Sequence, residues 1–137
     1  MSSPLIPSPL RKLVIERAKG KCEYCLISEE FSMYSHEIDH IIALKHGGET
    51  IASNLALSCL PCNRHKGSDL ASLDPITGEI VPLFNPRRQS WAEHFRLNNA
   101  MIVGITPVGR ATVFLLKFNV QNRRFNRQAL IDEELYP

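Results

Sequence analysis

The sequence predicts a small α+β domain whose centre is a strand–loop–strand–helix unit held by a four-cysteine metal clamp. Two observations predict the clamp and the unit. All four cysteines of the 137-residue chain fall in two Cys-x-x-Cys pairs, Cys22/Cys25 and Cys59/Cys62, a spacing typical of tetrahedral zinc sites. Between the pairs, two short apolar segments flank Gly47-Gly48, and a helix-like segment follows the second pair.

The chain is expected to begin with a flexible arm over residues 1–9, which are rich in Pro and Ser. A helix follows, because Ser8 suits an N-cap, Pro9 suits the first turn and Gly20 suits the stop. Its buried face is expected to carry Leu10, Leu13, Val14 and Ala18.

Between the cysteine pairs, residues 36–44 are predicted to form a strand with Ile38 and Ile42 packed. Gly47-Gly48 permits a tight loop, and residues 54–58 form a second strand carrying Leu55 and Leu57. A helix then begins near Asn63. The predicted order is therefore strand, loop, strand, helix.

Residues 71–137 are predicted to be a C-terminal extension that packs on, or continues, the domain over residues 10–70. Residues 72–78 suggest a turn-rich connection and residues 79–84 a short strand. A helical turn through Trp91 precedes a hairpin over 95–105. Thr106 and Pro107 resemble an N-cap and first helical residue, with Gly109 a weak helix former, and a basic helix over about 122–135 closes the chain.

Charge is distributed unevenly along the chain, although its net value is only +2. Residues 84–131 carry eight basic residues and one acid, a sum of +7, against −2 for residues 1–83 and −3 for the last six. An arginine-rich segment favours a phosphate-binding surface, and a solvated helix face is the alternative.

The sequence contains no apolar run long enough for a membrane span and no N-terminal pattern typical of a signal peptide. We therefore expect a cytoplasmic protein without a membrane partner, in which thiols stay reduced and bind metal. Two disulfides in a secreted protein are the alternative interpretation of the four cysteines.

The segment 38–67 resembles the HNH endonuclease family, whose fold element is the ββα-metal motif, also called the His-Me finger. The resemblance is carried by Ile38-Asp39-His40-Ile41, Gly47-Gly48, Asn54-Leu55, Leu57-Ser58-Cys59-Leu60-Pro61-Cys62-Asn63 and Lys66-Gly67. It covers roughly residues 10–70. Residues 71–137 also resemble the tail of small bacterial HNH proteins of unassigned role, a likeness that names no substrate.

The resemblance implies a role for each matching residue. His40 is the general base. Asn54 ties the loop backbone together and orients His40. Asp39 and Asn63 hold one catalytic ion, expected to be Mg²⁺ or Mn²⁺ because carboxylate and amide oxygens suit hard cations. Many relatives have His at position 63, so this chain is an H-N-N variant, and His65 is an alternative ligand. The cysteines hold a structural Zn²⁺.

The implied partner is nucleic acid, most simply double-stranded DNA nicked one strand at a time, with a homodimer needed for paired cuts. The residues expected to contact phosphate are Arg64, Lys66, Arg123, Arg124 and Arg127. Two other functions stay open: a non-catalytic zinc module that binds nucleic acid, and a zinc scaffold for protein interaction.

Overall fold

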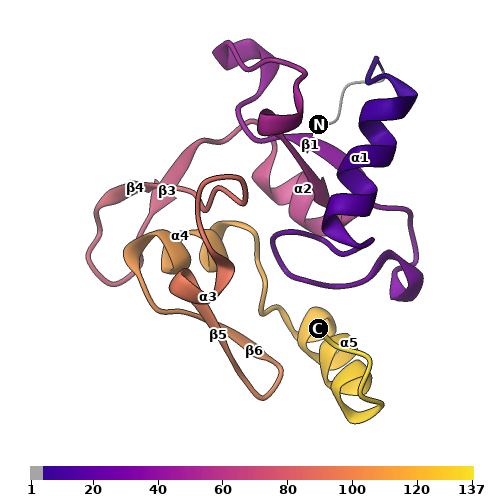
Figure 1. Ribbon diagram of the computed structural model, residues 1–137. Coiled ribbons are helices and arrows are strands. Elements are labelled where there is room, and N and C mark those ends of the chain that lie inside the picture. Colours follow the sequence, from indigo (N-terminus) through magenta and orange to yellow (C-terminus); the bar gives the residue numbers. More distant parts are fainter. Residues whose placement is uncertain (1–4) are drawn as a thin grey trace.

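The computed structural model describes residues 5–137, and a ββα unit forms the centre of its N-terminal half (Figure 1). Strands β1 (Glu37–His40) and β2 (Leu55–Ser58) pair antiparallel, and helix α2 (Leu60–Lys66) follows. The register runs without a bulge, from Glu37 opposite Ser58 to His40 opposite Leu55. The predicted order of strand, loop, strand and helix is therefore confirmed.

Helix α1 (Ser8–Ala18) packs against β2 and ends with Lys19 in a left-handed conformation. Its buried face carries Val14, with Leu10 and Ala18 beside it, as predicted. Leu13 is 43% exposed, so that part of the prediction is wrong. Of the arm expected over residues 1–9, residues 1–4 lie outside the described part, whereas Ile6 is buried in the same cluster as Val14.

The first strand is shorter than the sequence predicts, because the chain leaves the ladder after His40. Short 3-10 helices, η2 (Leu44–His46) and η3 (Ala52–Asn54), occupy the connection to β2. Residues 41 and 42 therefore lie outside the strand. Ile41 is buried and Ile42 is 40% exposed, opposite to the expected packing of Ile42.

The C-terminal half contains two hairpins and three helices. They are β3 (Ala71–Leu73) with β4 (Ile80–Pro82), α3 (Trp91–His94), β5 (Phe95–Asn98) with β6 (Met101–Gly104), α4 (Pro107–Leu115) and α5 (Gln121–Asp132). The hairpin over 95–105 and the Thr106 cap are confirmed, since the Thr106 hydroxyl accepts a hydrogen bond from the Gly109 amide at 3.0 Å. Strand β3 was not predicted. It is short, and its hairpin closes around Asp74, which Arg110 of α4 holds from outside the hairpin.

Gly109 is in α4 for a packing reason. A β-carbon there would lie 2.0 Å from the carbonyl oxygen of His94, so only glycine lets the helix approach α3 this closely. A residue with weak helix propensity is thus required by a tertiary contact.

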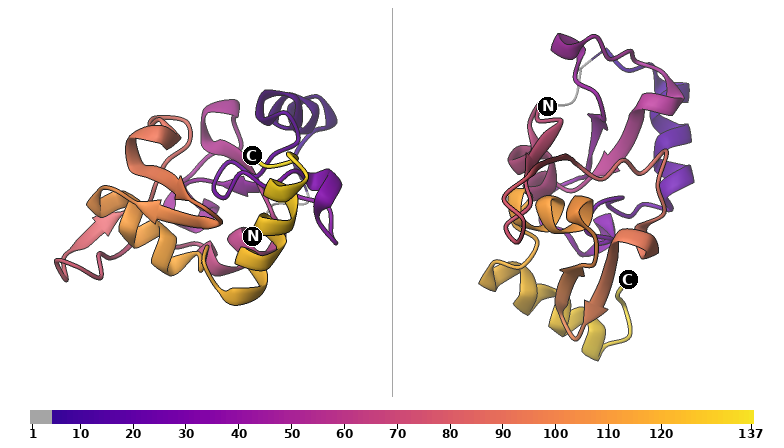
Figure 2. Two further views of the ribbon diagram at one scale, coloured as in Figure 1. Left: turned by 90° about the horizontal axis from the view of Figure 1, so that it is seen from below. Right: turned by 90° about the vertical axis from the view of Figure 1, so that its left-hand side faces the viewer.

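The two halves share one hydrophobic core. It joins the four cysteines to apolar residues of the extension, namely Phe84, Phe95, Ile102, Leu116 and Phe118. Helix α5, the yellow helix in Figure 2, returns to the N-terminal half, where its Arg123 contacts Cys62 Sγ. Among the described helices, none is long and apolar enough to cross a membrane.

Candidate metal centres and catalytic site

The four cysteines converge in the core as free thiols. Their sulfur atoms all lie within 4.8 Å of one another, and Cys25 Sγ is 3.6 Å from Cys59 Sγ. Tetrahedral zinc with Zn–S bonds of about 2.3 Å places its sulfurs roughly 3.8 Å apart, so the cluster has the size of a zinc site. In the described part of the chain no other group of three or more His, Cys, Asp or Glu side chains gathers in this way. The cluster therefore suits a structural metal such as zinc.

Helix α5 contacts these sulfurs directly. The Arg123 guanidinium donates to Cys62 Sγ at 3.0 Å and lies 3.8 Å from Cys59 Sγ. Burial lowers the pKa of Arg123, but the nearby cysteine sulfurs raise it above its ordinary value overall. Tyr136, near the end of the chain, donates its hydroxyl to the Cys25 carbonyl at 2.6 Å. The extension is therefore part of the surroundings of the cysteines.

Asp39 is 1% exposed and faces α2. Its Oδ2 accepts a hydrogen bond from the Tyr24 hydroxyl at 2.9 Å and lies 3.1 Å from the Lys66 ammonium. Lys66, itself 2% exposed, also donates to the Ile41 carbonyl at 3.1 Å. Burial raises the pKa of Asp39, and Lys66 and Tyr24 oppose that shift. The carboxylate is thus held by a buried cation.

His40 follows Asp39 on β1 and has a different partner. Its Nε2 lies 2.9 Å from the Thr50 hydroxyl, and the residue is 2% exposed. The different partners agree with the opposite directions of neighbouring side chains on a regular strand. Burial lowers the pKa of His40, and Asp39 opposes this in part. The lowered pKa favours a neutral imidazole at neutral pH.

Asn54 fixes the loop between the strands. Its Oδ1 accepts from the Ile42 amide, and its Nδ2 donates to the carbonyls of Ile42 and Glu49, each at 2.9 Å. Gly48 packs closely against these hydrogen-bonded groups. A β-carbon at this position would lie 1.7 Å from the Ile42 carbonyl oxygen. The geometry therefore requires both the amide and the glycine.

Asn63 lies on α2, three positions before Lys66 and so on the same helix face. It is 2% exposed, and its Oδ1 is a buried oxygen without a hydrogen-bond partner. Buried polar atoms are nearly always paired, so this oxygen is a candidate ligand atom. His65 is exposed on another face of the helix. Of the two alternatives, Asn63 is the one turned into the protein.

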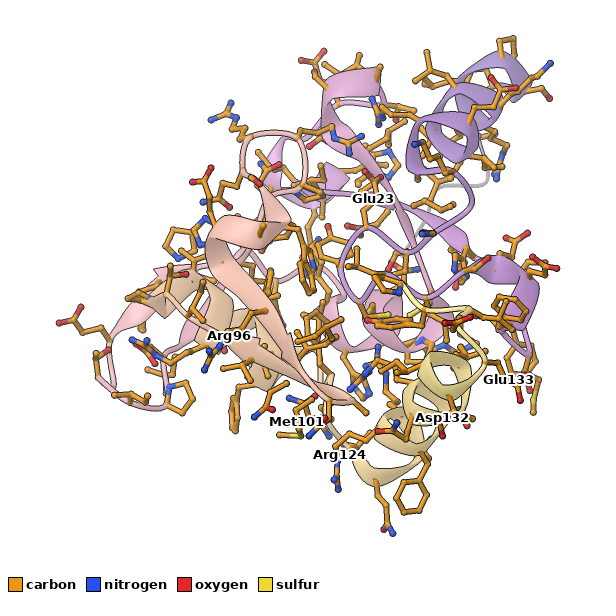
Figure 3. All side chains as sticks on the ribbon, turned by 60° about the horizontal axis from the view of Figure 1, so that its bottom comes forward. Glu23, Arg96, Met101, Arg124, Asp132 and Glu133 are labelled. Atoms are coloured by element: carbon orange, nitrogen blue, oxygen red, sulfur yellow. The ribbon has the colours of Figure 1, made fainter. Side chains whose placement is uncertain are left out.

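Three of the five expected phosphate contacts have buried charged groups. Lys66 binds Asp39, Arg123 binds cysteine sulfur, and Arg127, 2% exposed, donates to the carbonyls of Ala100 and Phe118. Internal partners already occupy hydrogen-bond donors of these three side chains, so the three are not proposed as phosphate contacts. Arg64 is exposed and Arg124 half-exposed. Figure 3 shows Arg124 on α5 and Arg96 on the hairpin.

Sequence reasoning missed three side chains around the site. Tyr24 stands between the first two cysteines and binds Asp39, and Thr50 binds His40. The third is the role of Arg123 as a partner of cysteine sulfur, which the sequence did not indicate. A tyrosine between two cysteines and a threonine after Gly47-Gly48 have no sequence spacing that indicates their partners. Only the folded chain brings them to their partners.

Comparison with known families agrees with this geometry. Residues 22–69 match the family model described as HNH endonuclease, a span from the first cysteine to just past α2. These residues are therefore similar to an HNH endonuclease domain, and the predicted resemblance is confirmed over this span. No curated protein and no solved structure matches the chain.

Proposed function

We propose that this protein is a metal-dependent endonuclease that hydrolyses phosphodiester bonds in double-stranded DNA. The observation that carries the proposal is the family match over 22–69, which spans the whole ββα unit and both cysteine pairs. Within that span Asp39, His40, Asn54 and Asn63 stand in the order that an H-N-N site requires.

In this proposal His40 takes a proton from the attacking water. Its lowered pKa keeps the ring neutral and able to accept a proton at neutral pH. With Nε2–H donating to the Thr50 hydroxyl, Nδ1 carries the lone pair that a general base needs. Asn54 does no bond-making and holds the loop that follows His40.

The donor atoms near α2 have the chemistry of a hard-cation site. Asp39 offers a carboxylate and Asn63 a buried oxygen without a partner, and both suit Mg²⁺ or Mn²⁺ better than a soft metal. When bound, such an ion would neutralise negative charge on the scissile phosphate and the departing oxygen. The structural Zn²⁺ would be held by the four cysteines, which leave no open position for water.

A plasmid-nicking assay tests the proposal. Nicking is expected with Mg²⁺ or Mn²⁺, and none with EDTA. General-base catalysis is worth about 10²–10⁴-fold, so His40→Ala is expected to reduce the rate by that factor. His46→Ala is the matched control, because this exposed histidine lies in the connection after β1 and its Nε2 is 3.1 Å from the Ser68 carbonyl oxygen. Equal loss in both variants would count against His40 as the base.

One observation favours a second candidate, a zinc module that binds nucleic acid without cutting it. Asp39 already has a cation and a hydroxyl donor, and His40 is 2% exposed. A domain of this kind would retard DNA on a gel without nicking it at any divalent-ion concentration. Cleavage that requires both the ion and His40 excludes this candidate.

A further inference from the structure

Arg123 places a positively charged side chain of the C-terminal extension next to the cysteine cluster. It lies on α5, beyond the residues that match the HNH model, and its guanidinium reaches Cys62 Sγ at 3.0 Å. The same guanidinium donates to the Leu116 carbonyl at 2.7 Å and the Lys117 carbonyl at 3.1 Å. It also lies over the Phe118 ring, 5.7 Å from its centroid. These contacts orient the side chain toward the sulfurs.

The charge of a filled site gives this contact its importance. Four thiolates around one Zn²⁺ carry a net charge of −2. The cysteines are between 0% and 3% exposed, so water does not solvate that charge. Buried net charge is costly unless it is paired. An arginine stays protonated in a protein interior and donates several N–H groups in one plane, so it is suited to this role.

We propose that Arg123 is a charge partner of the zinc–tetrathiolate centre, so that zinc binding and the docking of α5 stabilise each other. The inference rests on the structural zinc of the proposed function. Coupling between two sites is reciprocal. The extension therefore raises the affinity for zinc, and zinc in turn holds the extension on the core.

Arg127 provides a matched control one turn further along α5. It is also buried, at 2% exposure against 9% for Arg123, and its guanidinium donates to the carbonyls of Ala100 and Phe118 and to Asn119 Oδ1. Among the described residues it makes no hydrogen bond to sulfur. A purely structural role for the buried arginines predicts that losing either one has the same effect on zinc. A charge-partner role predicts an effect specific to Arg123.

The test uses the full chain as wild type, Arg123→Gln, Arg123→Lys and Arg127→Gln. Zinc affinity is measured by competition with a chromophoric chelator, and the Co²⁺-substituted proteins are compared by their sulfur-to-metal charge-transfer bands. Loss of a group that binds a metal ligand typically costs 10–100-fold in affinity. That loss is expected for Arg123→Gln. Arg127→Gln should stay within about threefold of wild type, and Arg123→Lys, which keeps the cation, should lie between them.

Unchanged affinity in Arg123→Gln, or an equal loss in Arg127→Gln, would overturn the proposal. If Arg123→Gln does not fold, Arg123→Lys is compared with Arg127→Gln. A zinc affinity of Arg123→Lys that equals or exceeds that of Arg127→Gln then overturns the proposal. Failure of wild type to bind zinc would refute the zinc site itself. The nicking assay with His40→Ala tests the proposed nuclease activity independently of these zinc-binding measurements.

Discussion

Replacing Lys66 with methionine is expected to lower the free energy of unfolding by about 3–5 kcal/mol at neutral pH. Methionine matches the length and shape of the lysine stem but has no ammonium. The Lys66 and Asp39 side chains are 3% and 1% exposed, and Nζ lies 3.1 Å from the carboxylate. Solvent does not screen a pair this deep, so the variant leaves a buried carboxylate without its cation. The remaining Tyr24 hydrogen bond, at 2.9 Å, compensates only in part.

The loss should depend on pH in a defined direction. Burial already raises the pKa of Asp39, and removing Lys66 removes the main opposing influence. The folded variant then binds more protons than the unfolded chain between about pH 3.9 and its raised pKa, so its stability falls as pH rises through that window. The difference from wild type should be small below about pH 4 and largest at neutral pH.

Urea denaturation of the zinc-loaded proteins without added Mg²⁺ or Mn²⁺, followed by circular dichroism at several pH values, measures both effects. The double variant Asp39→Asn/Lys66→Met removes both charges and keeps an oxygen for Tyr24, so it should recover much of the lost stability. A deficit below about 1 kcal/mol that does not change with pH would refute the argument, since surface ion pairs show values of that size.

The same variant tests whether Asp39 accepts a divalent ion. Without Lys66, the carboxylate has no competing cation. Adding Mg²⁺ should then stabilise Lys66→Met more than wild type, because a ligand that binds only the folded state shifts the unfolding equilibrium. Equal stabilisation of the two proteins would count against Asp39 as an ion ligand.

Three further predictions concern the loop between β1 and β2 and the β3–β4 hairpin. Gly48→Ala should destabilise the protein by about 1–3 kcal/mol or more in thermal melts, because a β-carbon there would lie 1.7 Å from a backbone oxygen. Thr50→Val removes the hydrogen bond to His40, worth about 1 kcal/mol, and should slow nicking roughly fivefold with the fold intact by circular dichroism. The Arg110 pair lowers the pKa of Asp74. That pair should stabilise the protein above about pH 4 and lose its effect as pH falls further, so Asp74→Asn should weaken the acid sensitivity of the melting temperature.

Local sequence patterns were enough to predict elements that are determined by residues close together in the chain. Thr106 followed by Pro107 marks a helix start, because a cap and a fixed φ act within a few residues. Leu55 and Leu57 lie on the same face of β2 and in one buried cluster, since a strand turns successive side chains to opposite faces. The order of the ββα unit followed from such signals.

Signals of this kind failed where a distant partner decides the structure. Strand β3 forms because its hairpin closes around Asp74, which an arginine 36 positions away holds in place. The basic side chains of α5 have the appearance of a phosphate-binding face in the sequence. In the folded chain Arg123 and Arg127 point inward, because unpaired sulfurs and carbonyls need donors there.

The sequence by itself determined that two cysteine pairs frame a ββα unit, since spacing and local pattern are properties of neighbouring residues. The motifs in that unit resemble those of HNH endonucleases. Only the tertiary structure decided that Lys66 neutralises Asp39, that Thr50 binds His40 and that an arginine of the last helix reaches the cysteine sulfurs. Hydrogen bonds and ion pairs in a buried site depend on which atoms meet once water is excluded. Arg123 and Cys59, for example, are 64 positions apart in the chain.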